Sequence, residues 1–433
     1  MEAVLSASDN SPPLIGPLSY GLDPQGSYIT NRRSSTTFSN VNSASPIGVK
    51  TITINCGSSS EWLDCESCVL SMLITNSGAQ PLRAATVGAH CLFDTLIVRM
   101  GSTEIERIDQ FGKVTEILTK LNYSSQKRIE MGMLGFGTQA FGASDSHTDA
   151  SYIPTFIAAG ETKRIYMKFS ISALFSQHRW CPLFALGGQG LSIQLQLAPA
   201  AQAVIASDGA TNYSQTYALS DIKLLGDMMS LDGQLQESYT SAMLSGSSLK
   251  MPVKCFEVLK AYLPADSNGS FDLPLSKNYT RLASLYAVFN QAEVAAGTAQ
   301  IVNTNYCPVS AKEGLRYHLA LGSKRLPDND VEGTSQAFWR LQSSLGLWNS
   351  LAHSGSISEA DYNSTCFAIG IDCEKIAGSG LMASGENLST GQTIFLKVKG
   401  MGTNAATVPR SATIFAFHER IISISDTVVD VFD

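Results

Sequence analysis

Short runs in which apolar and polar residues alternate recur along most of this chain and are separated by turn residues. The clearest run is LSIQLQL at residues 191–197, where every second residue is apolar. A period of two places the apolar side chains on one face of a β-strand and the polar ones on the other. Similar runs predict further strands at 49–54, 67–76, 95–100, 103–107, 164–169, 218–229, 253–262, 281–290, 366–372, 393–399 and 412–424. The pattern therefore predicts a protein made mainly of β-sheet.

Helical periodicity occurs in three places. Between residues 109 and 121 the apolar positions fall on one face of a helix, and Asp109 stands where an N-cap residue belongs. Residues 230–244 predict a connecting helix that Ser230 opens and Gly246 closes. A third helical patch is expected at residues 336–345. Because all three lie between predicted strands, we expect short helices confined to the connections.

Four short segments of the first half of the chain have counterparts in the second half, in the same order. The pairs are 49–54 with 253–258, 73–76 with 287–290, 100–103 with 321–324, and 165–169 with 394–398. Their offsets are 253 − 49 = 204, 287 − 73 = 214, 321 − 100 = 221 and 394 − 165 = 229. A steadily rising offset predicts two copies of one β fold, the second carrying small loop insertions.

The strands and the repeat together predict an all-β protein of two tandem jelly-roll sandwiches, roughly eight strands each, with short helices in loops. A length of 433 residues leaves room for two domains with separate cores. Residues 1–46 are rich in Ser, Asn, Pro and Gly and lack periodicity, so we expect an irregular N-terminal arm or strap. We place the first jelly roll at 47–229, a connecting helix or linker at 230–250, and the second jelly roll at 251–433.

The low fraction of charged residues and the negative net charge limit the kinds of partner that this chain is expected to bind. Charged residues make up 15% of the chain, against about 25% in typical globular proteins. Two explanations stay open: surfaces hidden in an assembly, or a polar surface that is simply uncharged. The net charge is −7, and the densest basic pair near the N-terminus is Arg32-Arg33. Proteins that package nucleic acid need clustered Lys and Arg, so we expect no direct binding of RNA or DNA.

The cysteines and the N-terminus indicate a cytosolic site of synthesis. Residues 1–22 contain Asp9 and three prolines and no sustained apolar run, so we expect no signal peptide, and no stretch of 18 uncharged apolar residues occurs. The nine cysteines are odd in number and irregularly spaced: Cys56, Cys65, Cys68, Cys91, Cys181, Cys255, Cys307, Cys366 and Cys373. This usage predicts reduced thiols instead of a disulfide framework.

Candidate chemistry is sparse. The six histidines show no metal-binding spacing: His90, His147, His178, His318, His353 and His418. Cys65 and Cys68 form one Cys-x-x-Cys pair with nothing to complete a zinc or redox motif. The stretch 146–149 sets Ser, His and Asp side by side, whereas triad residues meet through the fold. We therefore predict no catalytic residue, no cofactor-binding residue and no metal site.

Glycines and tryptophans are also better explained by structure than by a binding function. The Gly-rich stretches 135–137 and 187–190 lack the Lys-Ser/Thr ending of a phosphate loop, so turns are expected there. The four tryptophans, which in principle stack on sugars or bases, are Trp62, Trp180, Trp339 and Trp348. No basic cluster surrounds them, and we expect them to pack in the core or at an interface.

Several segments resemble double jelly-roll major capsid proteins, in particular those of polinton-like viruses and related double-stranded DNA viruses. The similarity covers roughly residues 47–433, and its motifs are short and structural. They are LLGD at 224–227, LD at 231–232, Tyr239 and LSGSSL at 244–249, LGSKRLP at 321–327 with FW at 338–339, PL at 182–183 with GG at 187–188 and the strand at 191–197, FAIGID at 367–372 with EK at 374–375, and VFD at 431–433.

The resemblance implies a structural protein and not an enzyme. It implies a homotrimer of pseudo-hexagonal outline that packs against neighbouring trimers in an icosahedral shell around double-stranded DNA. Expected partners are other copies of the chain, minor or penton capsid proteins and an inner membrane, but no specific nucleic-acid sequence. The expected location is the virion, after synthesis in the host cytosol. Residues 131–141 and 376–382 are candidate subunit contacts, and residues 1–46 are a candidate tether to a neighbouring trimer, a minor capsid protein or a membrane.

Two rival functions remain open at the level of sequence. The first is a carbohydrate-binding or carbohydrate-active protein of two sandwiches, which needs a carboxylate pair or an aromatic platform on one sheet. The second is a minor virion protein of the penton or fibre type, which usually has a single jelly roll or forms five-fold rings.

Overall fold

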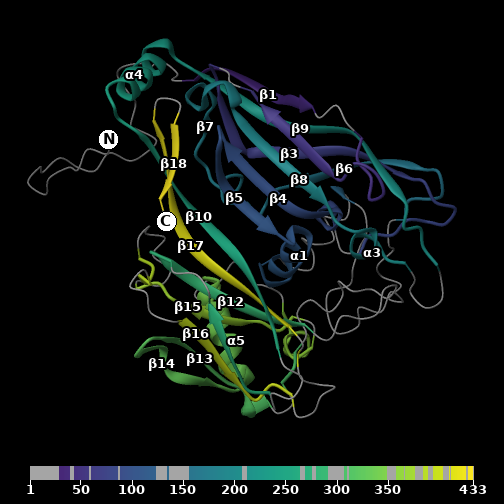
Figure 1. Cartoon of the computed structure of the whole chain (residues 1–433), viewed down its shortest axis with the longest axis vertical. Helices are drawn as coiled ribbons and strands as arrows, with labels where there is room; N and C mark the ends of the chain where they lie inside the picture. Colours follow the sequence, from purple (N-terminus) through teal and green to yellow (C-terminus); the bar gives the residue numbers. More distant parts are fainter. Residues whose placement is uncertain are drawn as a thin grey trace, which may run out of the picture.

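The computed structural model describes residues 29–39, 43–57, 60–85, 88–122, 134–135, 156–206, 212–263, 269–275, 279–290, 307–309, 312–348, 357–364, 366–375, 384–388, 394–402, 409, 411–425 and 428–432. These residues form two lobes that are stacked along the longest axis of the molecule (Figure 1). The first half of the chain builds one lobe and the second half builds the other, so the predicted tandem arrangement is confirmed.

The first lobe is a sandwich of two antiparallel sheets. One sheet has the strand order β1-β9-β3-β6, with the short β7 beside β3, and the other has the order β2-β8-β4-β5. The strands are β1 (Ile29–Ser39), β2 (Thr51–Cys56), β3 (Trp62–Asn76), β4 (Phe93–Met100), β5 (Thr103–Asp109), β6 (Thr162–Lys168), β7 (Cys181–Pro182), β8 (Leu191–Leu197) and β9 (Tyr217–Leu231).

The second lobe repeats this architecture. Its sheets have the orders β10-β17-β12-β15, with β18 beside β17, and β11-β16-β13-β14. The strands are β10 (Leu249–Tyr262), β11 (Phe271–Leu275), β12 (Leu282–Asn290), β13 (Arg316–Leu321), β14 (Lys324–Glu332), β15 (Ile369–Asp372), β16 (Ile394–Lys399), β17 (Ser411–Ser425) and β18 (Val428–Phe432). The predicted fold class, two jelly-roll sandwiches with short helices in loops, is confirmed.

The helices are short and lie in the connections. They are α1 (Phe111–Asn122), α3 (Ala200–Ala203), α4 (Gly233–Leu244), α5 (Gly333–Ser344) and α6 (Glu359–Tyr362), with 3-10 turns η2 (Ala89–Leu92), η3 (Leu183–Gln189) and η4 (Lys312–Gly314). The predicted caps were wrong in detail. Asp232, not Ser230, caps α4, because its carboxylate accepts a hydrogen bond from the Gln234 N–H at 3.2 Å. Asp109 still belongs to β5, and its carboxylate accepts from Arg107 Nε at 3.1 Å.

Residues 29–39 overturn part of the expectation for the N-terminus. They were placed in an irregular arm, but they form β1, which pairs antiparallel with β9 at the edge of the first sheet. Most of its side chains are exposed on both faces, which explains why no period of two marks the strand.

Strand order shows how the two copies correspond. If β7 and β18 are left out, the described part of each lobe has eight strands, and strands with the same rank in chain order hold the same place in the sheets. The sheet β1-β9-β3-β6 corresponds to β10-β17-β12-β15, and the sheet β2-β8-β4-β5 corresponds to β11-β16-β13-β14. The matches at offsets 214 and 221 are confirmed, since they join the ends of β3 and β12 and the turns of the β4-β5 and β13-β14 hairpins. The matches at offsets 204 and 229 were wrong. They paired β2 with β10, whose true counterpart is β1, and β6 with β16, whose true counterpart is β8.

The corrected offsets fall toward the C-terminus instead of rising. β8 and β16 begin 394 − 191 = 203 residues apart, and β9 and β17 begin 411 − 217 = 194 apart. Two connections cause the fall. From α1 to β6 the chain spans 162 − 122 = 40 positions against 369 − 344 = 25 from α5 to β15, and from β8 to β9 it spans 217 − 197 = 20 against 411 − 399 = 12 from β16 to β17. The first copy, not the second, carries the larger insertion there.

Alternation of burial builds the core of each sandwich. In β2 the side chains of Ile52, Ile54 and Cys56 are buried, while the residues between them are exposed. β12 differs, because all nine of its residues are buried. This strand lies between β17 and β15 in the sheet. The hydroxyl of its Tyr286 donates a hydrogen bond to the Ser344 carbonyl at the end of α5 at 2.8 Å. Helix α5 therefore reaches the face of this sheet that would otherwise meet solvent.

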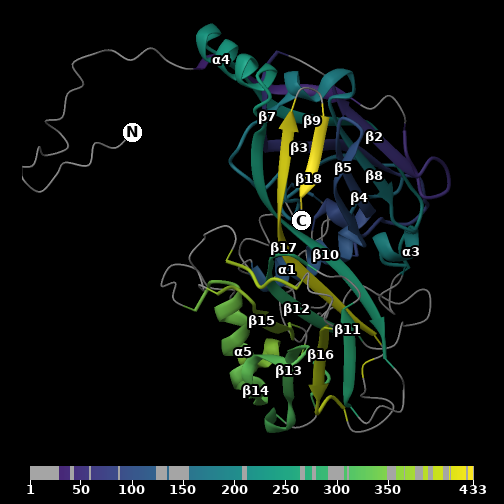
Figure 2. The same ribbon diagram turned by 60° about the vertical axis from the view of Figure 1, so that its left-hand side comes forward.

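The longest ladder of the molecule joins the two lobes. β10 and β17 pair without a break from Leu249 opposite Ile424 to Tyr262 opposite Ser411. One half of the ladder belongs to a sheet of the second lobe, where β17 also pairs with β12, and the other half runs beside the first lobe, where β17 pairs with β18 (Figure 2). The Thr103 hydroxyl of β5 donates to the Val429 carbonyl of β18 at 2.8 Å, which ties the lobes together.

A carboxylate is enclosed at this seam. Glu106 on β5 is 2% exposed, and it accepts hydrogen bonds from Ser172 Oγ at 2.5 Å and from the Ala173 N–H at 2.8 Å. It lines a cavity of about 450 Å³ between the lobes, with Arg420 and Glu257 on the opposite wall. Burial raises the pKa of Glu106 from 4.5 to about 6, although the two hydrogen bonds and the charge of Arg420 lower it.

Replacing Glu106 with Gln should remove a pH dependence of stability. Because its folded pKa lies above its unfolded pKa, the contribution of Glu106 is fully present below pH 4.5 and is lost as the pH rises through about 6. The difference corresponds to about 2 kcal/mol of unfolding free energy for a fully buried group. Urea unfolding at pH 4.5 and pH 7.5 should show this loss in the natural chain and not in the Glu106→Gln variant. Glu104→Gln, an exposed position on the same strand, should keep the loss, and an unchanged profile in Glu106→Gln would contradict the assignment.

Candidate functional site

The groups considered for catalysis do not converge. Cys65 and Cys68 are buried within β3. The hydrogen bond with Cys181, followed by burial, raises the pKa of Cys65, and burial raises the pKa of Cys68. Raised pKa values disfavour the reactive thiolate. His178 is exposed beside Glu66, whereas His318 pairs with Asp330 at 2.9 Å. Within the described ranges no group of three or more His, Cys, Asp or Glu residues is arranged to hold a metal ion.

The glycine stretch at 187–190 is a turn that requires glycine. It covers the kinked end of η3 and leads into β8, and Gly187 and Gly190 have φ angles of 66° and 61°. A Cβ atom on Gly190 would lie 2.2 Å from the Cys56 carbonyl oxygen, so β2 and this turn approach too closely for any side chain. The other glycine stretch, 135–137, is described only at its first residue, and residues 146–149 lie outside the described residues.

The tryptophans form two pairs. Trp339 and Trp348 meet near the end of α5 with ring centroids 6.1 Å apart, and Trp348 is 55% exposed. Trp62 and Trp180 line one groove, whose wall includes residues of β9, β10 and β17. Sequence reasoning treated the four as separate packing residues, because only the fold brings distant positions together.

The proposed subunit contacts at 131–141 and 376–382 lie outside the described residues, except for Leu134 and Gly135. Leu134 is an exposed apolar side chain, 58% accessible. The part of the N-terminal region that is described, β1, has side chains that are mostly exposed and polar. Because few of its side chains are buried, β1 must be held to the sheet mainly by polar contacts.

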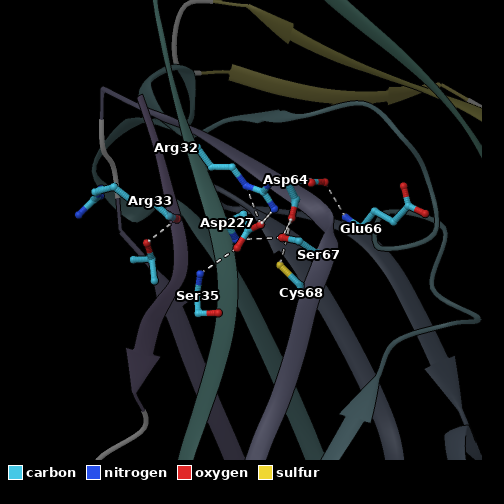
Figure 3. A network of polar contacts seen from close by, with 9 residues as sticks. Arg32, Arg33, Ser35, Asp64, Glu66, Ser67, Cys68 and Asp227 are labelled. Atoms are coloured by element: carbon cyan, nitrogen blue, oxygen red, sulfur yellow. Dashed lines mark hydrogen bonds and ion pairs between the residues drawn. The ribbon is translucent and has the colours of Figure 1, made fainter. Parts of the chain in front are cut away.

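Asp227 on β9 fastens β1 to the sheet (Figure 3). Its carboxylate accepts hydrogen bonds from the Arg32 guanidinium, including Nε at 3.1 Å, and from the Ser35 N–H at 2.8 Å. Its own N–H donates to Ser67 Oγ on β3 at 2.8 Å, and Ser67 donates in turn to the Asp64 carbonyl at 2.7 Å. We call Arg32, Ser35, Ser67 and Asp227 the N-terminal clasp.

Two irregularities create the clasp. The pairing of β1 with β9 shifts register between Arg33 and Thr36, where Ser35 has a φ of 53°. The pairing of β3 with β9 shifts between Asp64 and Val69. These bulges turn polar groups of β1 and β3, the two strands that flank β9, toward Asp227. The hydrogen bond from Arg32, followed by that from Ser35, lowers the pKa of Asp227, so its carboxylate stays charged at neutral pH.

A groove of about 520 Å³ opens beside the start of β1. Its wall is mostly apolar and aromatic: Ile29, Trp62, His178, Arg179, Trp180, Pro182, Leu231, Leu235, Tyr239, Leu249, Lys250, Met251 and Ile424. Trp62 fixes α4 as one side of the groove, because its ring contacts Tyr239 edge-on at 5.2 Å and its Nε1 donates to Gln236 Oε1 at 2.8 Å. No local pattern in the sequence marks this site, since its wall comes from both halves of the chain.

Replacing Asp227 with Ala should loosen β1. The change leaves the Ser35 N–H and Arg32 without their acceptor, which costs about 1–3 kcal/mol in a partly buried setting. Hydrogen exchange of the amides in 29–39 should accelerate about tenfold or more. Asp227→Asn, which keeps an acceptor oxygen, should have a smaller effect. Asp272→Ala on β11 removes an exposed ion pair to Lys397 at 3.6 Å and should leave this exchange unchanged. Equal exchange in Asp227→Ala and the natural chain would show that the clasp does not hold β1.

Known proteins are similar to this chain in three-dimensional structure but not in sequence. No protein-family model matches the chain, and no curated protein is significantly similar to it in sequence. Solved structures are similar in three dimensions. A chain of the cryo-EM structure of the Sputnik virophage aligns with a TM-score of 0.64 at 10% identity, covering 99% of this chain and 93% of that one.

Two further structures agree over nearly the whole length. PBCV-1 VP54, as fitted into a reconstruction of the virophage Sputnik, has a TM-score of 0.62 at 12% identity and covers 95% of this chain and 99% of its own. The Faustovirus major capsid protein has a TM-score of 0.60 at 10% identity, with 96% and 95% covered. At such identities the likeness is one of fold, and the chain is thereby shown to have the double jelly-roll fold.

Proposed function

We propose that this chain is a major capsid protein and not an enzyme. The observation that carries the proposal is the paired architecture, two jelly rolls of identical strand order fixed together by one continuous ladder. Whole-chain similarity to the Faustovirus major capsid protein supports it, because the match includes both lobes and the connection between them. A fold alone does not fix a function, so the proposal depends on the paired architecture and the whole-chain similarity taken together.

The duplication has a direct use in a shell. Three copies around a three-fold axis would present six similar lobes, which gives a capsomer with a pseudo-hexagonal outline. Closed rings are the usual symmetry of soluble oligomers, and six similar edges allow each capsomer to pack against like neighbours. The seam between the lobes favours this arrangement, since β18 and the β10–β17 ladder hold both lobes as one unit.

The remaining assignments belong to the same proposal. The shell would be icosahedral and enclose double-stranded DNA in a virion, after synthesis in the host cytosol. Its partners would be neighbouring trimers, minor or penton capsid proteins and an inner membrane. None of the described helices has the length and apolarity needed to cross a bilayer. We retain the boundary at residues 230–250, around α4, and assign β1 to the first unit, so that the proposed arm shortens to the residues before it.

Measurement of mass in solution tests the capsomer. Light scattering of the purified chain should give a species near 3 × 46.3 kDa, and electron microscopy should show particles with six-sided outlines. A stable monomer or a five-fold ring would contradict the proposal. Failure to isolate a soluble monomer agrees with it, because folding and trimer formation are coupled in obligate oligomers.

A further inference from the structure

We propose that the groove beside β1 is a docking site for the chain's own N-terminal segment, residues 11–18, of sequence SPPLIGPL. The segment would bind in an extended polyproline II conformation. The inference concerns a contact within one chain and stands apart from the proposed capsid function.

The wall of the groove has the chemistry that recognises such a segment. Trp62, Trp180 and Tyr239 supply aromatic surface to the wall, and Pro182 and Leu235 add apolar surface to it. Aromatic grooves bind proline-rich peptides because the polyproline II helix is already extended and loses little conformational entropy on binding. Trp180, Leu235 and Tyr239 are each only partly buried in the described residues, so apolar surface remains for an occupant.

Residues 11–18 match that surface. Pro12, Pro13 and Pro17 fix φ near the polyproline value, and the residue before each proline is also biased toward extended conformations. Leu14 and Ile15 supply apolar side chains to the aromatic wall. No other stretch of the first 28 residues combines several prolines with large apolar residues.

The position of Ile29 favours docking within the chain over docking of a second copy. Ile29 is the first described residue and is itself part of the groove wall. The ten residues 19–28 that connect it to the segment reach at most about 35 Å when extended, so the segment stays within that distance of Ile29 and of the groove wall. Within them, DPQG at residues 23–26 has the sequence of a β-turn, which would shorten this reach. A short tether of this kind gives an effective concentration in the millimolar range.

The charges of the N-terminal segment and of the groove rim are also complementary. Residues 1–28 contain Glu2, Asp9 and Asp23 but no Lys or Arg. The exposed rim of the groove carries Arg179 and Lys250, which are held beside each other by a hydrogen bond from Arg179 Nη1 to the Lys250 carbonyl at 3.1 Å. An acidic segment is therefore drawn to this rim.

Photocrosslinking of the full-length chain tests the proposal. Tyr239 is replaced by p-benzoylphenylalanine, and this chain is co-expressed with a probe-free chain whose segment carries Ile15→Val, which changes its peptide mass. Irradiation should join position 239 to residues 11–18, and the captured peptide should contain Ile15, because it comes from the probe's own chain. The same probe at Leu244, on the same helix but 72% exposed and outside the groove, should capture none of it.

Limited proteolysis gives a second readout that needs no probe. Chymotrypsin should cleave after Leu18 and Tyr20 about tenfold faster in Leu235→Glu than in the natural chain, since a buried charge expels the segment and cleavage follows the open population. Leu244→Glu, the matched control on α4, should cleave at the natural rate. Three results of the crosslinking experiment would overturn the proposal. The probe at position 239 could capture the mass-shifted peptide of the Ile15→Val chain, capture a segment other than residues 11–18, or capture no peptide. Identical cleavage of Leu235→Glu and Leu244→Glu would overturn the proposal equally.

Discussion

The antiparallel ladder between β10 and β17 is the interaction on which the rest of the structure depends. Its unbroken register runs from the seam with the first lobe to the far end of the second. In the second lobe β12 and β15 continue the sheet, and at the seam β18 continues it instead. The same β10–β17 ladder thus continues from the sheet of the second lobe to the seam with the first lobe. The lobes are therefore not independent bodies joined by a flexible linker. A rigid pair of lobes is what a capsomer with six similar edges needs.

Two carboxylates show how position decides the behaviour of the same chemical group. Glu106 is enclosed at the seam, and desolvation raises its pKa to about 6 despite two hydrogen bonds. Asp227 is only 8% exposed, but Arg32 and the Ser35 N–H lower its pKa. Burial penalises the charged form in the first case, and a cation with an aligned donor favours it in the second. One residue thus makes the seam sensitive to pH, and the other fastens β1 at neutral pH.

Local patterns predicted most of the strands but not their partners. The alternation at 191–197 predicted β8 with its observed bounds, and the two hairpin turns predicted the correct offset between β4-β5 and β13-β14. The false repeat matches arose because any half-buried strand has the same period of two, whichever sheet position it occupies. Among the strands that the predicted ranges omit, three have a clear physical reason: β1 is exposed on both faces, β11 carries Pro274 at a sheet edge, and β18 is short.

The sequence by itself determined the fold class, the duplication and the position of the connecting helix, because periodicity and turn residues act over a few neighbouring positions. It also indicated that little of the chain serves chemistry. Only the tertiary structure decided which strands correspond, where Glu106 is enclosed, and which residues form the clasp and the groove. Each of these features joins positions far apart in the chain, such as Arg32 with Asp227 or Trp62 with Tyr239. Such contacts leave no local pattern, since the energy that fixes them comes from packing between sheets.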